Sequence, residues 1–257
     1  MLPLKDNIPT RTFPVVTVVI IVLNVLVYFG FEQGGFSAPG NDNVVVEYSF
    51  IPYELTNTDQ LCAETPNERI GCGSKEALDT RGLDSDQPSV FLTIFTAMFM
   101  HGSLLHLGGN MLFLWIFGNN IEDAMGKVKF IVFYLLGGVA ATLAQYATDT
   151  GAAIPNLGAS GAIGAVLGGY ALLYPRARVV TLIFIVFFIT LLELPALLVL
   201  GAWFLLQLLD ASSQPVGGGG VAVWAHIGGF VFGLIAVKLF ASRAQKDYDR
   251  HNRLPVY

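Results

Sequence analysis

Ser160 stands between glycines at the head of an apolar segment, "PNLGASGAIGAVLGGY", residues 155–170. Three of the four histidines, His101, His106 and His226, lie at the edges of other apolar segments, and Asn110 follows His106 on the same helical face. A serine hydroxyl becomes a nucleophile when a base lies within hydrogen-bonding distance. These residue types indicate acyl-transfer chemistry, whereas a lone serine in an apolar helix usually packs or bonds to its own helix.

The candidate base has no evident carboxylate partner. Glu122, Asp123 and Asp210 lie at the ends of apolar segments and Glu193 lies at a break, so none of the four is positioned to complete a triad. We therefore expect a Ser160–His226 dyad in which packing, rather than an aspartate, orients the histidine. The expected oxyanion donors are His106, Asn110 and the backbone N–H of Ser160. His101 sits where a segment begins, so a role as a cap or anchor competes with a role in the site.

The chain that must position these residues is 54% hydrophobic and 13% charged, with a mean hydropathy of +0.61. Soluble domains carry about 25% charged residues, so this chain lacks the polar surface to cover itself in water. Its long apolar runs predict a multi-pass membrane protein with helical spans. The net charge of −5, without a basic stripe, gives no indication of nucleic-acid binding. The first run is too long for a cleaved signal peptide, so we expect it to be retained as a span.

The hydropathy pattern predicts six spans, at about 14–31, 103–120, 129–147, 158–174, 190–209 and 221–240. The fifth belongs to an apolar run, 179–209, that Pro195 interrupts. As one helix this run would be about 46 Å long, more than the roughly 30 Å hydrocarbon core. It is compatible with two short spans, or with an interfacial piece followed by one tilted, kinked span.

Basic residues in short loops decide between these options, because cytoplasmic loops are enriched in Lys and Arg. With six spans, the basic residues that flank spans all fall on one side, and the loops 148–157 and 210–220 contain none. The flanking residues are Lys5, Arg11, Lys127, Lys129, Arg176, Arg178, Lys238, Arg243, Lys246, Arg250 and Arg253. Seven spans would place the basic tail, 241–257, outside. We therefore expect an all-α bundle of six spans with cytoplasmic N and C termini.

This topology places the polar residues at one depth. The second, fourth and sixth spans all run inward, so His106, Asn110, Ser160 and His226 lie about one to two helical turns below the outer surface. Glycine stripes on two of these spans would allow close packing in lipid. The stripes are Gly164 and Gly168 on the fourth span, and Gly229 and Gly233 on the sixth. If they face each other, Ser160 and His226 meet at the top of the contact.

The long loop 32–89 faces outward in this topology and holds both cysteines, Cys62 and Cys72. Disulfides are typical of oxidising compartments, so we expect a Cys62–Cys72 bridge, with two free thiols as the alternative. The apolar end of the loop, "PSVFLTIFTAMFM", predicts a segment in the outer interface, either a substrate platform or a packed support. The glycine-rich loop 212–220 is expected to act as a mobile cap or to be a plain hairpin.

Short motifs in three spans resemble those of the rhomboid family of intramembrane serine proteases. They are "HGSLLHLGGN" in the second span, "GASG" in the fourth and "AHIGG" in the sixth. "GNNIEDAMG", "YPRARV" and "LPALLVLGAWFLLQ" are also similar to rhomboid sequences. The resemblance covers roughly residues 90–240, and the ordered set of motifs is more specific than any one of them.

The resemblance implies Ser160 as the nucleophile, His226 as the general base, and His106 and Asn110 as oxyanion donors. His101 and Gly158 would be supporting neighbours: His101 opens the first motif and Gly158 opens "GASG". It also implies a multi-pass protein of a membrane, expected to be a prokaryotic cell membrane, with the site facing the extracytoplasmic side. The substrates would be membrane proteins with a destabilised transmembrane helix, cleaved in or near that segment without a metal or cofactor.

Two departures from the family pattern concern the support of the site. Many rhomboid proteins carry Trp-Arg upstream of the first motif histidine, where this chain has Leu92 and Thr93. Some place a tyrosine four residues after the serine, stacked on the histidine, and here that position is Gly164. The base must therefore be held in another way.

Two functions from other classes compete with the protease. One is a catalytically inactive rhomboid-like protein that binds membrane clients. The other is a histidine-lined transporter, although the chain lacks the intramembrane carboxylates and inverted repeat typical of transporters. A zinc metalloprotease is disfavoured because no H-E-x-x-H motif occurs.

Overall fold

The structure is a computed structural model that describes residues 2–36, 41–65, 70–83, 87–185, 188–213 and 222–241. Most of the expected cap loop, 212–220, and nearly all of the basic tail, 241–257, lie outside the described residues. The helical elements, with π segments η1 and η3 and a 3-10 segment η2, are α1 (Val15–Leu26), η1 (Val27–Phe31), α2 (Asp42–Tyr48), α3 (Pro52–Thr56), α4 (Lys75–Thr80), α5 (Val90–Thr96), η2 (Ala97–Phe99), α6 (Leu104–Phe113), η3 (Leu114–Gly118), α7 (Asn119–Met125), α8 (Lys127–Thr148), α9 (Ser160–Leu173), α10 (Ala196–Ser213) and α11 (Val223–Phe240). The strands are β1 (Leu2–Asp6), β2 (Leu61–Glu64), β3 (Ile70–Gly73), β4 (Arg178–Ile185) and β5 (Phe188–Pro195).

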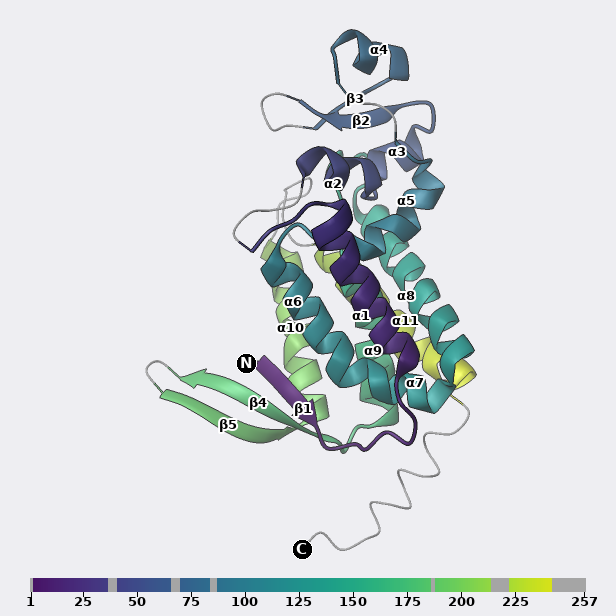
Figure 1. The fold of residues 1–257 in the computed structure, drawn as a ribbon. Helices are drawn as coiled ribbons and strands as arrows, with labels where there is room; N and C mark the ends of the chain where they lie inside the picture. Colours follow the sequence, from purple (N-terminus) through teal and green to yellow (C-terminus); the bar gives the residue numbers. More distant parts are fainter. Residues whose placement is uncertain are drawn as a thin grey trace, which may run out of the picture.

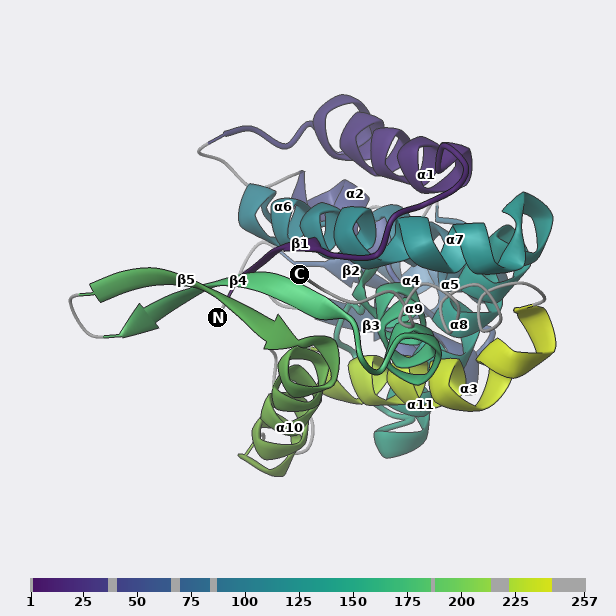
Figure 2. The same ribbon diagram turned by 90° about the horizontal axis from the view of Figure 1, so that it is seen from below.

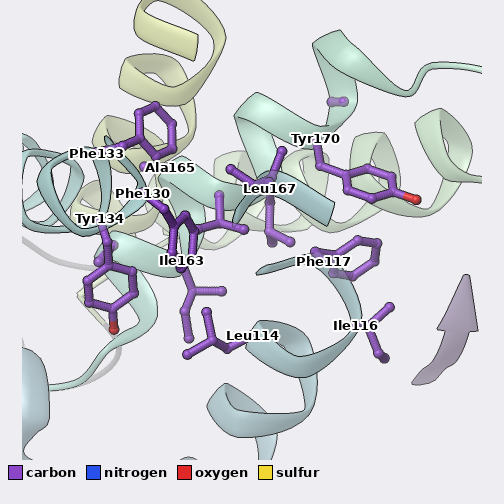
Figure 3. Packing of buried hydrophobic residues seen from close by; sticks show 14 of the residues in the cluster. Leu114, Ile116, Phe117, Phe130, Phe133, Tyr134, Ile163, Ala165, Leu167 and Tyr170 are labelled. Atoms are coloured by element: carbon purple, nitrogen blue, oxygen red, sulfur yellow. The ribbon is translucent and has the colours of Figure 1, made fainter. Parts of the chain in front are cut away.

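Helix α9 lies at the centre of the helical body (Figure 1). Every residue from Gly161 to Ala171 is buried, as expected for a helix that is apolar or small on all sides. Helices α8 and α11 and the π segment η3 pack around it. Figure 3 shows Phe117 of η3 and Phe130 of α8 beside α9, and the Phe117 ring meets Tyr170 edge-on, with ring centroids 4.9 Å apart.

The contact between α9 and α11 is closed by glycines. Those predicted to line it are Gly164, Gly168, Gly229 and Gly233. A Cβ atom added to Gly168 would lie 2.1 Å from the backbone oxygen of Phe230, and one on Gly233 would lie 2.0 Å from that of Ala165. Real Cβ atoms do not approach so closely, so the two backbones touch because side chains are absent. The two predicted stripes thus face each other.

Two features differ from the predicted all-α bundle. Strands β1, β4 and β5 form an antiparallel sheet, and the β4–β5 hairpin projects sideways from the helices (Figure 2). The predicted fifth span, 190–209, is therefore wrong at its start, because residues up to Pro195 are strand and the helix begins at Ala196. The hairpin sequence is rich in β-branched and aromatic residues, which favour strands, and a proline in a helix interior kinks or breaks the helix.

The described parts of the long loop 32–89 fold into a small cap at the end of the bundle near α5 (Figure 1). Strands β2 and β3 pair there, and Cys62 is joined to Cys72 by a disulfide, the pairing expected from the sequence. The buried carboxylate of Glu54 accepts hydrogen bonds from the backbone N–H of Cys62, at 2.8 Å, and from the side-chain amide of Gln87, at 2.9 Å. This cap therefore has its own polar and covalent ties.

The apolar segment at the end of this loop forms α5 and η2. It bends by 81° from the following helical stretch, Leu104–Met125, in accord with a segment that lies across the bundle end rather than along it. Within the described residues, α8 and α11 are long and apolar enough to cross a membrane, and a third crossing is possible if the bent pair is one span. Helices α1 with η1, α9 and α10 are apolar but shorter. The number of six spans stays a prediction.

Buried carboxylates tie the end of the bundle away from Ser160. Glu122 of α7 accepts hydrogen bonds from the backbone N–H and the hydroxyl of Thr17 in α1, both at 2.8 Å. Asp6 of β1 accepts from the hydroxyl of Tyr170 in α9 and from the amide of Asn120 in α7, both at 2.6 Å. The first strand and first helix are thus anchored to the central helices.

The glycine contact predicts a stability effect. Gly233→Ala should lower the midpoint of thermal unfolding in detergent, by an amount equivalent to about 1–3 kcal/mol, because its methyl group overlaps the Ala165 carbonyl. Gly201→Ala in α10 is the matched control: its Cβ would meet no heavy atom within 4 Å, so stability should stay equal or rise. Equal midpoints for Gly233→Ala and the wild type would contradict the close α9–α11 contact.

Candidate active site

Ser160 and His226 meet at one end of the α9–α11 contact. Ser160 is the first residue of α9, and its Oγ lies 2.8 Å from Nε2 of His226, which is in the first turns of α11. This distance is within the range in which histidine can take a serine proton. The two residues are 66 positions apart in sequence, and the glycine stripes below them bring them together.

The turn into α9 depends on Gly158. Its φ of +118° belongs to the region that favours glycine, and its N–H donates to the Ala97 carbonyl at 2.8 Å. A Cβ atom here would lie 2.8 Å from the His106 ring and 3.5 Å from Ser160 Oγ. Gly158 therefore lies between His106 and Ser160, and a side chain at this position would overlap the His106 ring.

His101, His106 and Asn110 form the wall beside this turn. The side-chain amide of Asn110 donates to Nε2 of His101, at 3.0 Å, and the rings of His101 and His106 meet edge-on with centroids 5.0 Å apart. Ser103 caps α6 by accepting from the His106 N–H at 3.2 Å. The structure thus brings His106 next to Ser160 and links Asn110 to the site through His101, which is fully buried and bonded rather than a surface anchor.

The first turn of α9 also faces the site. None of the described side chains caps this helix, so the N–H groups at its start lack a side-chain partner in the described structure. Such N–H groups, at the positive end of the helix dipole, favour a developing negative charge. The backbone N–H of Ser160 belongs to this set.

Three residues that contact His226 or His101 were not predicted from the sequence. Gln207 of α10 places its side-chain oxygen 2.7 Å from Nδ1 of His226, and the ring of Trp203, one turn earlier, lies 5.8 Å from the His226 ring. These two residues contact the His226 ring, which the side-chain-free Gly164 cannot do. The spacing of Trp203 and Gln207 puts them on one helical face, but only the position of α10 shows which partner that face meets.

The third missed residue is Glu32, directly after η1. Both carboxylate oxygens, fully buried, accept from the backbone N–H of His101, at 3.0 and 3.2 Å. Burial raises the pKa of Glu32 to about 7, against the smaller opposing effect of that hydrogen bond. The only sequence signal was an acidic residue at the end of the first apolar run, and nothing indicated that its partner lies 69 residues away.

Across the described ranges, no three His, Cys, Asp or Glu side chains lie close enough to hold a metal ion. A small cavity of about 30 Å³ adjoins Ser160 instead, and its polar lining includes Gln145 and Asn156. That volume suits one or two water molecules.

The buried Glu32 predicts a pH dependence of stability. Its folded-state pKa, about 7, exceeds the ordinary 4.5, so its contribution is fully present below pH 4.5 and is lost as pH rises through 7. The thermal unfolding midpoint of the wild type should therefore fall relative to that of Glu32→Gln between pH 5 and 8. The glutamine amide keeps a hydrogen-bond acceptor but never ionises. Thermal unfolding of both proteins in detergent, followed across this range, measures the difference. Parallel curves would contradict a titrating Glu32.

Comparison with known proteins identifies the family. The family model described as "Rhomboid domain" matches residues 88–243. The chain is 30% identical over 175 residues to "Rhomboid protein 1, mitochondrial" of Saccharomyces cerevisiae, covering 65% of this chain and 47% of that protein. It is 38% identical over 89 residues to "Presenilin-associated rhomboid-like protein A, mitochondrial" of Danio rerio, covering 34% and 23%. It is 29% identical over 162 residues to "Rhomboid protease GluP" of Bacillus subtilis, covering 63% and 24%.

The matches span less than half the length of each of these relatives. Two of the three are mitochondrial by name, which does not fit the expected prokaryotic cell membrane, although the third comes from a bacterium. The expectation of an integral membrane protein agrees with the family and with the apolar helices. The matched region extends from just before α5 to just beyond α11, covers more than half of the chain and contains Ser160 and His226, so this chain belongs to the rhomboid family.

Proposed function

We propose that this chain is an intramembrane serine endopeptidase in which Ser160 is the nucleophile and His226 the general base. The 2.8 Å contact between Ser160 Oγ and His226 Nε2 carries the proposal. The name of the bacterial relative, "Rhomboid protease GluP", adds support from the family. Both residues sit where glycine packing positions them, which favours a pair selected for contact over two isolated polar residues.

The reaction follows from the arrangement of donors and acceptors. His226 Nε2 takes the proton of Ser160 Oγ as the oxygen attacks the carbonyl carbon of the scissile peptide bond. The imidazolium then gives this proton to the leaving amide nitrogen, the C–N bond breaks, and an acyl-enzyme remains on Ser160. A water molecule loses a proton to His226, attacks the ester carbonyl and releases the carboxylic acid, and the returned proton restores Ser160.

The oxyanion would be held at the start of α9. Gly158 lies between the His106 ring and Ser160 Oγ, so the oxyanion on the carbon bonded to Ser160 Oγ would lie within reach of the Ser160 backbone N–H and the His106 side chain. Asn110 gives one N–H of its amide to His101, and its second N–H is our candidate third donor. The water-sized cavity beside Ser160 would hold the attacking water molecule.

The membrane placement we propose has six spans, formed by α1 with η1, α6–α7, α8, α9, α10 and α11. Helix α9, with 14 residues, is about 21 Å long, shorter than the roughly 30 Å hydrocarbon core, so its first residue would lie below the surface. The strand-like pairing of Phe50 with Asn156 supports a site that opens toward the loop 32–89. Basic flanking residues favour cytoplasmic termini. The whole chain, 1–257, would then be one membrane domain with a basic tail.

The proposed substrates are membrane proteins with a destabilised transmembrane helix. An intact helix buries each peptide bond among its neighbours, so a segment must unwind before its carbonyl can reach Ser160. No cofactor takes part in the proposed reaction, because serine, histidine and N–H groups supply every proton transfer and charge contact it needs.

Removing either reactive side chain should abolish the proposed activity. Ser160→Ala and His226→Ala should each lower cleavage of a single-span reporter protein in detergent by about 100-fold or more. Ser212→Ala is a matched control, since this exposed hydroxyl donates to the Leu209 carbonyl of its own helix and, among the described residues, contacts neither Ser160 nor His226. Cleavage that survives either site change at the wild-type rate would refute the assignment.

A fluorophosphonate probe distinguishes the protease from a client-binding relative without activity. The probe should label wild type and Ser212→Ala but not Ser160→Ala, because only a serine with an adjacent base reacts readily. An unlabelled, correctly folded wild type that still binds a single-span protein would favour the inactive alternative.

A further inference from the structure

The two ring nitrogens of His226 are bonded to two different helices. Nε2 lies 2.8 Å from Ser160 Oγ of α9, and Nδ1 lies 2.7 Å from the side-chain oxygen of Gln207 in α10. The histidine side chain is largely buried, so water competes little for either nitrogen. Gln207 takes no part in the steps of the proposed reaction, yet it faces the atom opposite the reacting one.

We propose that Gln207 is a positioning residue that sets the tautomer and orientation of His226. This inference rests on the proposed protease function. Ser160, His226 and Gln207 would form a three-residue relay in which an uncharged amide stands where Ser–His–Asp proteases place a carboxylate.

The hydrogen-bonding capacities of the groups carry this step. A neutral imidazole has one N–H and one lone pair, and an amide oxygen can only accept. The contact with Gln207 therefore places the proton of His226 on Nδ1, which leaves the Nε2 lone pair facing the Ser160 hydroxyl. The other tautomer would set the Nδ1 lone pair against the amide oxygen and would leave Nε2 unable to accept the serine proton.

Helix α10 supports the ring through one face. Trp203 precedes Gln207 by four residues, so the two share that face, and the Trp203 ring lies 5.8 Å from the His226 ring. The neighbouring residues Leu205 and Leu206 are exposed and belong to other faces of the helix. Gln207 is thus a polar side chain in an apolar helix whose oxygen meets the ring of the base.

The amide also differs from a carboxylate in charge. An aspartate or glutamate would stabilise the imidazolium by direct charge attraction, whereas an amide orients the ring without doing so. The consequence is a sharp difference between two substitutions. Gln207→Leu removes the acceptor, and Gln207→Glu keeps an acceptor and adds a charge.

Steady-state cleavage of a single-span reporter by the full-length protein in detergent tests this role, with Ser212→Ala as the control on the same helix. Gln207→Leu should lower kcat about 10-fold to 100-fold with little change in KM, the usual effect of losing one buried hydrogen bond. Gln207→Glu should retain more activity than Gln207→Leu and should move the acid limb of the pH–activity profile to higher pH. Ser212→Ala should leave both kcat and the profile unchanged.

A second readout does not depend on activity. In Ser160→Ala protein with ¹⁵N-labelled histidine, the NMR signals absent from the His226→Ala spectrum should show a protonated Nδ1 and an unprotonated Nε2. Adding Gln207→Leu should convert this pattern to a mixture of tautomers. This measurement remains decisive if the wild type fails to cleave, in which case the proposed function falls and the inference about His226 is judged on the spectrum.

Either of two results would overturn the inference. One is an unchanged kcat and pH profile for Gln207→Leu. The other is an equal loss for Gln207→Leu and Gln207→Glu with an unmoved acid limb and an unchanged histidine spectrum, which would reduce Gln207 to a structural contact.

Discussion

The rest of the structure depends on the backbone contact between α9 and α11. At Gly168 and Gly233 the facing helix backbones occupy the space that a single methyl group would need. In lipid, where apolar burial gives little net drive for helix association, such contact and the dispersion it provides hold helices together. The close packing of α9 and α11 also sets the distance between the side chains at the end of the contact. Ser160 and His226 can form a hydrogen bond only if the two helix axes are close.

Helix α9 presents its glycine face to α11, and its remaining faces are buried by other segments. Aromatic rings of η3 and α8 pack around α9. At the end of the bundle away from the site, Asp6 and Glu122 bind the first strand and the first helix to the central helices. These two carboxylates thus lie away from Ser160 and His226, whereas the buried Glu32 binds the backbone of His101 at the edge of the site. Near the pair, the described polar partners are amides, hydroxyls and imidazoles, which avoid the cost of an uncompensated charge in an apolar layer.

The support of the site is divided among segments that are distant in sequence. Glu32 holds the backbone of His101, His101 holds the amide of Asn110, and α10 holds the ring of His226. Where some rhomboid proteins place a tyrosine on the serine helix, this chain has Gly164. A Cβ atom at Gly164 would lie 2.9 Å from the backbone oxygen of His226, so α11 occupies the space of such a side chain. A ring there would keep α11 away, so the closer helix contact and the ring support from α10 belong together.

The amino-acid sequence by itself determined the membrane character, the candidate nucleophile and base, and the two glycine stripes. Hydropathy, charge and helical spacing are properties along one chain, and they place residues on faces and at depths. The tertiary structure decided what no single segment contains: the hairpin in place of the start of the predicted fifth span, the tie from Glu32 to His101, and the choice of Gln207 and Trp203 as supports. These depend on how each helix is rotated about its axis and which neighbour it meets. That is settled by packing among all segments at once, so spacing within one segment cannot predict it.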